Sequence, residues 1–508
     1  MRSQIAETPA GSVEGEVLED QPVAVFRGVP YAEAPTGERR FAPPVPVAPW
    51  PGVRAATRWG LAAPQPTGGP FGGLVPGMEP GAIGEDCLSV TVWAPTGDGG
   101  GARPVLVWIH GGAYQIGSSS LATYDGARLS ADEGVVVVSV NYRLGALGFL
   151  DLRRHGGEAI GAVTNAGLLD QILALRWVRD HIAAFGGDPS RVTVFGESAG
   201  AGSILHLLGS GRLEGVVQRA IVQSPGVHMT LDADQGEAVA AALLARVGVA
   251  AAEIGKLTSV PWEELVEAQS AALMDVYGLV GSMPFHPVID GGIVPRSPVA
   301  DGPARGFDLI LGGTSEEMRL FRDPRAKDAS RDALVEMLEE HLRGHPVRAL
   351  GVPADRAGTL VDAYLADQGS ASEASTAILT DSTMRLPAMQ AADGHTGGAG
   401  RTFSYLFTWQ APGLGAFHAV DLPFTFGTLD REGWGPFVGA DADAERLSAA
   451  MRQAWAAFAA TGDPSCGRLG TWPGYDLPAR HSMELGRRCG PIEDPHGDIR
   501  RRWLPGQL

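Results

Sequence analysis

The fold is decided by the stretch Val192-Thr193-Val194-Phe195-Gly196-Glu197-Ser198-Ala199-Gly200. Its first four residues predict a buried strand, and the small residues 201–205 that follow predict the start of a helix. Between strand and helix, two glycines leave room for a tight turn that carries Ser198. This G-x-S-x-G bend is typical of an exposed nucleophile. The pentapeptide alone is a weak signal in a chain with 70 glycines, and an idle serine is the alternative, so the flanking strand and helix favour the nucleophile.

Further short apolar runs predict more strands of the same sheet. They are rich in β-branched residues and almost wholly apolar, as strands buried on both faces are. Amphipathic stretches separate them; residues 168–185, for example, have apolar residues at helical spacing and end at a Gly-Gly-Asp-Pro stop. This alternation predicts an α/β fold with a mostly parallel sheet covered by helices on both faces. The expected strands are 105–109, 135–140, 192–195, 220–223, 309–311 and 402–407.

A single domain over residues 1–508 fits the pattern better than two or more. The length of 508 residues would allow several domains, but large α/β sheets accommodate long insertions. Residues 230–275 and 325–390 are rich in Ala, Leu and Glu, and we interpret them as helical insertions that cap the carboxyl edge of the sheet. The Gly- and Pro-rich stretch 64–85 is typical of a surface loop.

Charge and cysteine content exclude several partners. The net charge is −18, and an acidic surface repels phosphate backbones, which disfavours binding to nucleic acid. The N-terminus has no apolar segment typical of a secretory signal, and no apolar run reaches membrane-spanning length. Three cysteines are too few for a disulfide framework. These features predict a cytoplasmic protein that associates with neither nucleic acid nor membrane.

Two glycines after the expected strand 105–109 are candidate oxyanion donors. The backbone amides of Gly111 and Gly112 can approach a substrate closely and point at developing negative charge. The amide of Ala199, next to the nucleophile, is the third expected donor. Each such donor stabilises a transition state by about 3 kcal/mol. A simple strand-to-loop turn is the alternative, and we expect His110 to brace this loop.

The candidate base and acid follow from chain order, which in sites of this kind is Ser, then acid, then His. This order excludes the histidines that precede Ser198. His418 lies between the expected strand 402–407 and a later helix, and His395 is its main rival. The adjacent carboxylates Glu316 and Glu317 follow the strand 309–311. Since neighbouring side chains point in different directions, we expect only one of them to reach the histidine.

Six further segments, distributed over nearly the whole chain, have a specific pattern. They are Phe26-Arg27-Gly28-Val29-Pro30-Tyr31-Ala32, Arg40-Phe41, Trp50-Pro51-Gly52-Val53, Glu85-Asp86-Cys87-Leu88, Asn141-Tyr142-Arg143-Leu144-Gly145 and Ala183-Ala184-Phe185-Gly186-Gly187-Asp188-Pro189. Together they make the chain resemble the bacterial type-B carboxylesterases, whose family includes cholinesterases and mammalian liver carboxylesterases. The resemblance implies an α/β-hydrolase fold and a serine carboxylesterase that hydrolyses short to medium acyl or aryl esters. It implies no metal and no organic cofactor.

The resemblance also assigns roles around the histidine. The segment 415–423 is similar to the family's G-A-x-H-x-x-E-L, with Asp421 in place of the Glu, and it implies that His418 is the base. We expect this conservative replacement to leave the chemistry unchanged. Glu197 resembles a carboxylate that the family places near the histidine, and a surface or helix-cap role is the alternative.

For the acid, the resemblance selects one of the two carboxylates. Anchoring on Leu320-Phe321, which the family also has, places the catalytic Glu at Glu317 and an Asp position at Glu316. The glycine that usually follows is Met318 here. His418 would then take the proton of the nucleophile, while Glu317 orients the imidazole and an acyl-enzyme forms and is hydrolysed.

Two alternatives remain for the function. A non-catalytic adhesion protein of the same fold is the first. An amidase or carbamate hydrolase would use the same residues, and comparing a p-nitrophenyl ester with its anilide separates it from an esterase. A choline-ester specialist is not expected, because Phe71 is the only aromatic residue between Pro64 and Cys87, where cholinesterases hold the substrate with a Trp. The earlier Cys that pairs with the Cys87 position in many relatives is also missing.

Overall fold

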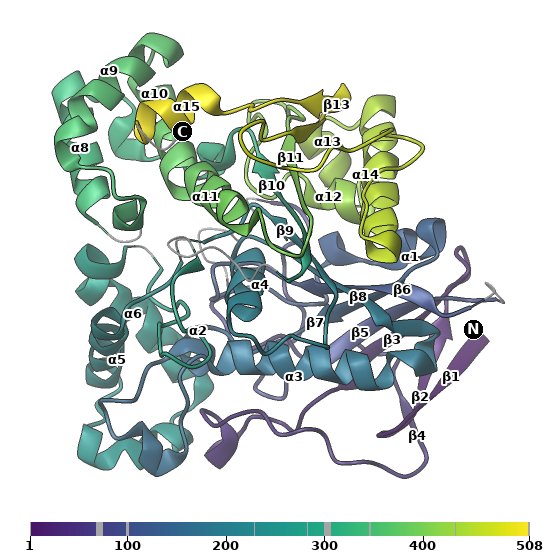
Figure 1. The fold of residues 1–508 in the computed structure, drawn as a ribbon. Helices are drawn as coiled ribbons and strands as arrows, with labels where there is room; N and C mark the ends of the chain where they lie inside the picture. Colours follow the sequence, from purple (N-terminus) through teal and green to yellow (C-terminus); the bar gives the residue numbers. More distant parts are fainter. Residues whose placement is uncertain are drawn as a thin grey trace.

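A single sheet runs through the computed structural model, which describes residues 2–67, 75–97, 101–227, 229–281, 283–298, 306–344, 347–431 and 433–505 (Figure 1). Within these residues the strand order is β1-β2-β3-β5-β7-β6-β8-β9-β10-β11-β12-β13, with β4 beside β2. The strands are β1 (Arg2–Thr8), β2 (Gly11–Val17), β3 (Val23–Pro30), β4 (Val53–Ala55), β5 (Ser89–Pro95), β6 (Arg103–Ile109), β7 (Val136–Val140), β8 (Gly187–Glu197), β9 (Arg219–Gln223), β10 (Asp308–Thr314), β11 (Thr402–Phe407), β12 (Ser482–Leu485) and β13 (Cys489–Ile492).

The central strands, from β7 to β12 in the sheet order, are parallel. The predicted α/β fold with a mostly parallel sheet is therefore confirmed. Antiparallel strands at both ends of the sheet, β1, β2, β3 and β5 on one side and β13 on the other, were not predicted. In β1 and β2 most side chains are exposed or half-buried, so these strands lack the apolar runs that reveal the central ones.

Alternating side chains of strands β6 to β10 enter two separate cores. On β6, Val105, Val107 and Ile109 pack in one core, together with α3 (Ala166–His181) and α4 (Ala199–Gly209). Leu106 and Trp108 pack in the other core. That second core contains α1 (Ala127–Glu133), α12 (Leu422–Phe426) and α14 (Ala442–Thr461). Helices thus cover both faces, which explains why the strand sequences are apolar throughout.

Helices also occupy both predicted insertions. The first contains α5 (Ala233–Arg246) and α6 (Trp262–Val280), and the second contains α8 (Arg331–Arg343), α9 (Ala357–Gln368), α10 (Ala371–Leu379) and α11 (Leu386–His395). The second insertion has its own apolar core, to which Trp503 of the C-terminal helix α15 (Gly497–Trp503) contributes. Figure 1 shows that α15 lies beside α10, although the two helices are far apart in the sequence.

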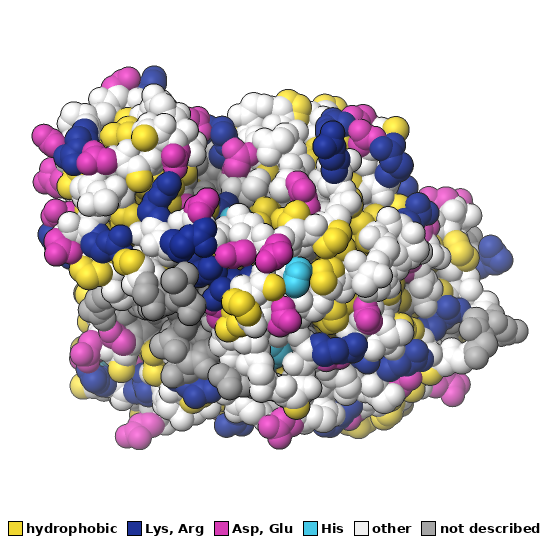
Figure 2. Space-filling model, turned by 45° about the horizontal axis from the view of Figure 1, so that its top comes forward, with side chains coloured by type: hydrophobic (Ala, Val, Ile, Leu, Met, Phe, Trp, Pro, Cys, Tyr) yellow, Lys and Arg dark blue, Asp and Glu magenta, His cyan; other side chains and the backbone are white. Residues whose placement is uncertain are grey.

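The predictions about nucleic acid, membrane and disulfides can be compared with the surface, the helices and the cysteines of the structure. On the face shown in Figure 2, basic side chains are interspersed with acidic ones, so the excess negative charge forms no single patch there. Among the described residues, no single helix is long and apolar enough to cross a bilayer, although α5 and the next helical segment, Ala251–Ser259, meet both criteria as a pair bent by 69°. Cys87, Cys466 and Cys489 are free thiols. Phe71 lies outside the described residues.

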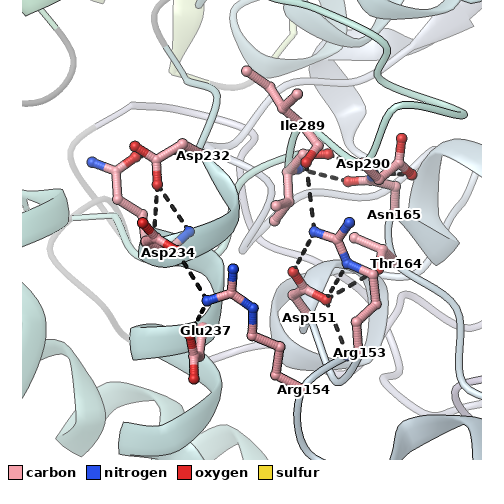
Figure 3. Close-up of polar contacts among 12 residues, drawn as sticks. Asp151, Arg153, Arg154, Thr164, Asn165, Asp232, Asp234, Glu237, Ile289 and Asp290 are labelled. Atoms are coloured by element: carbon pink, nitrogen blue, oxygen red, sulfur yellow. Dashed lines mark hydrogen bonds and ion pairs between the residues drawn. The ribbon is translucent and has the colours of Figure 1, made fainter.

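Polar contacts tie the first insertion to the loop that precedes α3 (Figure 3). Arg154 donates hydrogen bonds to Asp234 and Glu237 on the first turns of α5. The adjacent Arg153 forms a two-pronged ion pair with Asp151, at 2.8 and 2.6 Å. Both arginines are half exposed, so solvent screens these ion pairs and each stabilises the fold only weakly.

A buried asparagine connects the start of α3 to the segment after the first insertion more strongly than these exposed ion pairs do. Asn165 donates to the carbonyl of Val288 at 2.8 Å and to Asp290 at 3.0 Å, and it accepts from the Val288 amide at 2.8 Å. It also caps α3 in the left-handed conformation, with φ 61°, which asparagine tolerates better than most residues. One side chain thus fixes the start of α3 against segment 288–290.

Asn165→Ala is expected to lower the free energy of unfolding by about 2–4 kcal/mol, because it leaves buried polar groups unpaired and places a Cβ-bearing residue without a compensating hydrogen bond at positive φ. Asn165→Gly is the matched control: it loses the same hydrogen bonds but adopts the backbone conformation freely, so its loss should be smaller. Denaturant unfolding followed by tryptophan fluorescence measures both. An Asn165→Ala protein as stable as the parent would contradict this role.

Candidate active site

The turn after β8 places Ser198 at the first turn of α4, with the unusual backbone angles φ 56° and ψ −122°. Its amide donates to the carbonyl of Gln223 at the end of β9, at 3.0 Å. A Cβ atom on Gly200 would lie 2.1 Å from the carbonyl oxygen of Ile109, and one on Gly196 would lie 2.7 Å from it. Both glycines of the motif are therefore required, because the end of β6 passes directly against the turn.

The structure brings His418 and Glu317 together. Nδ1 of the imidazole lies 2.6 Å from Oε2 of Glu317, and the His418 amide donates to the Glu317 carbonyl at 3.0 Å. The other carboxylate oxygen accepts from the Ser224 hydroxyl and from the Thr314 amide, both at 2.7 Å. Burial alone would raise the pKa of Glu317, but these hydrogen bonds and the imidazole lower it below its usual value. Glu317 is thus held as a carboxylate.

The two rival residues lie elsewhere. Glu316 accepts from Arg319 Nε at 2.5 Å and from the Ala416 amide at 2.9 Å, so its carboxylate is directed away from the imidazole. His395 is buried at the end of α11, where its Nδ1 lies 2.7 Å from the hydroxyl of Thr402. Neither arrangement places these groups beside Ser198.

A second carboxylate faces the other side of the imidazole. Oε1 of Glu197 lies 3.0 Å from Nε2 of His418, and Glu197 is only 3% exposed. Burial alone would lower the pKa of His418, but Glu197 and Glu317 outweigh it and raise the pKa well above its ordinary value. Burial also raises the pKa of Glu197, against the opposing effect of His418. The imidazole is therefore stabilised as a cation between two carboxylates.

Nε2 lies within ion-pair distance of Glu197 Oε1, but in the described part of the chain that oxygen accepts no hydrogen bond, so the two atoms are close without being aligned. Among the described residues, the hydroxyl of Ser198 has no hydrogen-bond partner, so the expected serine–histidine hydrogen bond is not formed. The opposite charges of a protonated imidazole and the Glu197 carboxylate attract each other, which accounts for this proximity. Glu197 links the two residues: a Cβ on Gly111 would lie 2.9 Å from Oε2 of Glu197 and 3.1 Å from Cβ of Ser198, and Oε1 of the same carboxylate is the atom near Nε2 of His418.

The loop after β6 lies over this space and presents free amides. Within the described chain, the N–H groups of Gly111 and Gly112 donate no hydrogen bond. Ala199 is the first residue of α4, where an N–H has no partner within the helix. Together with the positive end of the helix dipole, these amides favour negative charge next to Ser198.

His110 braces this loop. Its ring stacks on Tyr142 with centroids 4.5 Å apart, and the Tyr142 hydroxyl donates to the His110 carbonyl at 2.7 Å. Nδ1 of His110 lies 2.8 Å from the carbonyl oxygen of Gly111. Burial lowers the pKa of His110 to about 4, so the ring is neutral and acts through packing.

The sequence did not reveal the buried network around Asp421. This carboxylate accepts from Gln223 Nε2 at 2.9 Å and from the Tyr405 hydroxyl at 3.0 Å. The Gln223 carbonyl in turn accepts the Ser198 amide, so the network connects the nucleophile turn to the segment that carries His418. Burial and the nearby Glu197 raise the pKa of Asp421 to about 7. The sequence offered two signals for Asp421, its position three residues after His418 and its replacement of the family's Glu, but neither indicated its partners.

Comparison with known proteins identifies the family and the fold of this chain. Residues 2–493 match the carboxylesterase family. The para-nitrobenzyl esterase of Bacillus subtilis is 36% identical, with all of both chains covered, and the phenmedipham hydrolase of Pseudarthrobacter oxydans is 37% identical, covering 93% of this chain and 92% of the relative. The crystal structure of a Geobacillus stearothermophilus carboxylesterase superimposes with a TM-score of 0.86 at 35% identity, covering 98% and 99% of the two chains. The resemblance and the α/β-hydrolase fold are confirmed, and this chain belongs to the carboxylesterase family.

Proposed function

We propose that this carboxylic-ester hydrolase acts through an acyl-enzyme on Ser198, with His418 as general base and Glu317 as the residue that orients the imidazole. The observation that carries the proposal is the 2.6 Å contact between His418 Nδ1 and a buried Glu317. It leaves Nε2 as the ring atom that faces the nucleophile turn. The chain order of the three residues is the one that this fold uses.

In the proposed mechanism, Nε2 of the neutral imidazole first moves from Glu197 to the Ser198 hydroxyl, with which it forms a hydrogen bond. Nε2 then accepts the hydroxyl proton while the serine oxygen attacks the ester carbonyl. The negative oxygen that forms accepts hydrogen bonds from Gly111, Gly112 and Ala199. The alcohol leaves with the proton from His418. Water then attacks the acyl-enzyme, with His418 again as base, and releases the carboxylic acid and the free serine.

For the substrate, we propose esters with short to medium acyl groups or with aryl groups. The relative named para-nitrobenzyl esterase supports an aromatic alcohol portion. For the location, we propose the cytoplasm, which is supported by the low and odd number of cysteines.

A fluorophosphonate probe tests the nucleophile directly. Intact-mass analysis should detect one adduct on the parent protein and none on Ser198→Ala.

With a p-nitrophenyl ester as substrate, His418→Gln and Glu317→Gln should lower kcat by at least ~10³-fold, since triad members act as a unit. Glu316→Gln is the matched control for the acid and should remain active. Labelling at another residue, or loss of activity in the Glu316 variant alone, would refute the assignment.

The carboxylate of Glu197 should help to set the pH at which kcat/KM rises. The base must be neutral, so kcat/KM rises as pH rises through the pKa of His418, and this acid limb should lie above pH ~6.5, the ordinary value for histidine. Glu197→Gln removes a group that raises the pKa, so it should move the acid limb to lower pH. Glu316→Gln, which removes a neighbouring carboxylate that does not contact the ring, should leave the limb in place. If the acid limb of kcat/KM stays at the same pH in Glu197→Gln, Glu197 does not raise the pKa of His418 as proposed.

A further inference from the structure

A π-helical turn, Thr380–Arg385, interrupts the second insertion between α10 and α11. Such turns are rare and occur frequently at functional sites. The first four side chains of the turn are polar and buried, and buried polar groups are costly unless they are paired. The hydrogen-bond partners of these side chains therefore indicate the role of the turn.

Two side chains of this turn hold the backbone on either side of Glu317. Arg385 donates from Nη2 to the carbonyl of Ser315 at 2.6 Å, and the Thr380 hydroxyl accepts from the amide of Met318 at 3.1 Å. The loop after β10 is thus fixed just before and just after the acid. The first contact spans 70 positions in the sequence and the second spans 62. Since Glu317 itself is buried, a shift of this backbone moves its carboxylate relative to the imidazole.

Arg385 is oriented by a chain of buried contacts that ends at the C-terminal helix. Its Nη1 donates to Asp381, which is 1% exposed and also accepts from the hydroxyl of Tyr364. That hydroxyl accepts from the indole N–H of Trp503 in α15, at 2.7 Å. The indole is buried in the apolar core of the insertion, so the contact depends on α15 being docked.

We propose that Thr380 and Arg385 are positioning residues for Glu317, and that the docking of α15 fixes the orientation of Arg385. The inference rests on the proposed role of Glu317 as the acid. It assigns a catalytic purpose to the π-helical turn and makes the C-terminal helix part of the support of the site.

A purely structural role and a positioning role predict different results. If the contacts only hold the insertion on the sheet, their loss lowers the unfolding temperature but leaves kcat and the pH profile of the folded enzyme unchanged. If they position Glu317, their loss weakens its contact with His418. Because Glu317 raises the pKa of that histidine, the acid limb of kcat/KM should then move to lower pH while kcat falls.

The test uses Thr380→Val, which keeps the shape of the side chain but removes the acceptor. We expect kcat to fall roughly 10-fold with KM unchanged, since misplacement by about 1 Å costs up to about 100-fold. The acid limb should move to lower pH, and Thr380→Ser should restore both. Ser382→Ala is the matched control, because that hydroxyl contacts the Ile378 carbonyl and His341, and both readouts should stay unchanged. Trp503→Phe, which removes the indole N–H donor together with part of the buried ring, should shift both readouts as Thr380→Val does, by a smaller amount.

The proposal is overturned if Thr380→Val and Trp503→Phe keep the parental kcat and acid limb and lose only thermal stability. If Thr380→Val does not fold, Trp503→Phe alone decides between the two roles. Glu317→Gln is assayed in parallel. If that variant is crippled while the other two are not, positioning fails and the proposed acid stands; if Glu317→Gln retains full activity, the proposed function itself fails.

Discussion

The site depends on the parallel alignment of four strands, β6, β8, β10 and β11. In a parallel sheet all carboxyl ends meet at one edge, and each of these strands is followed there by one component. The loop after β6 supplies free amides, the turn after β8 supplies Ser198, and the segments after β10 and β11 supply Glu317 and His418. Residues separated by more than 200 positions thus converge because hydrogen-bonded strands fix their register.

At that edge, charge decides how the imidazole is held. Two buried carboxylates flank His418, and each is within hydrogen-bond distance of one ring nitrogen. This arrangement favours the protonated form of the imidazole, because the positive charge is compensated on both sides, as the proposed mechanism requires. If His418 is the general base, as we propose, it must lose this proton before it can act, so Glu197 would link the activity of the enzyme to its pH dependence. The network of Asp421, Gln223 and Tyr405 lies behind this pair and adds a further carboxylate to the same buried region.

Much of this could be predicted from the sequence, for identifiable reasons. Strands such as 105–109 and 192–195 are buried on both faces, so their composition alone reveals them. The elbow is visible because the close approach of β6 permits only glycine at positions 196 and 200. The edge strands β1 and β2 escaped prediction, since their mostly exposed residues have no apolar pattern. The π-helical turn also escaped prediction, and the resemblance placed Glu197 near the histidine without showing which ring nitrogen it approaches, because both features depend on side chains from distant segments. No local pattern encodes such pairs.

The contact between His418 and Glu317 is the central claim, and low-field proton NMR tests it most directly. A proton shared between Nδ1 and a carboxylate at 2.6 Å resonates far downfield of the backbone amides. We predict such a signal in the parent protein and in Glu316→Gln, and its loss in Glu317→Gln and in His418→Gln. A downfield signal that persists in Glu317→Gln, or disappears in Glu316→Gln, would contradict the account.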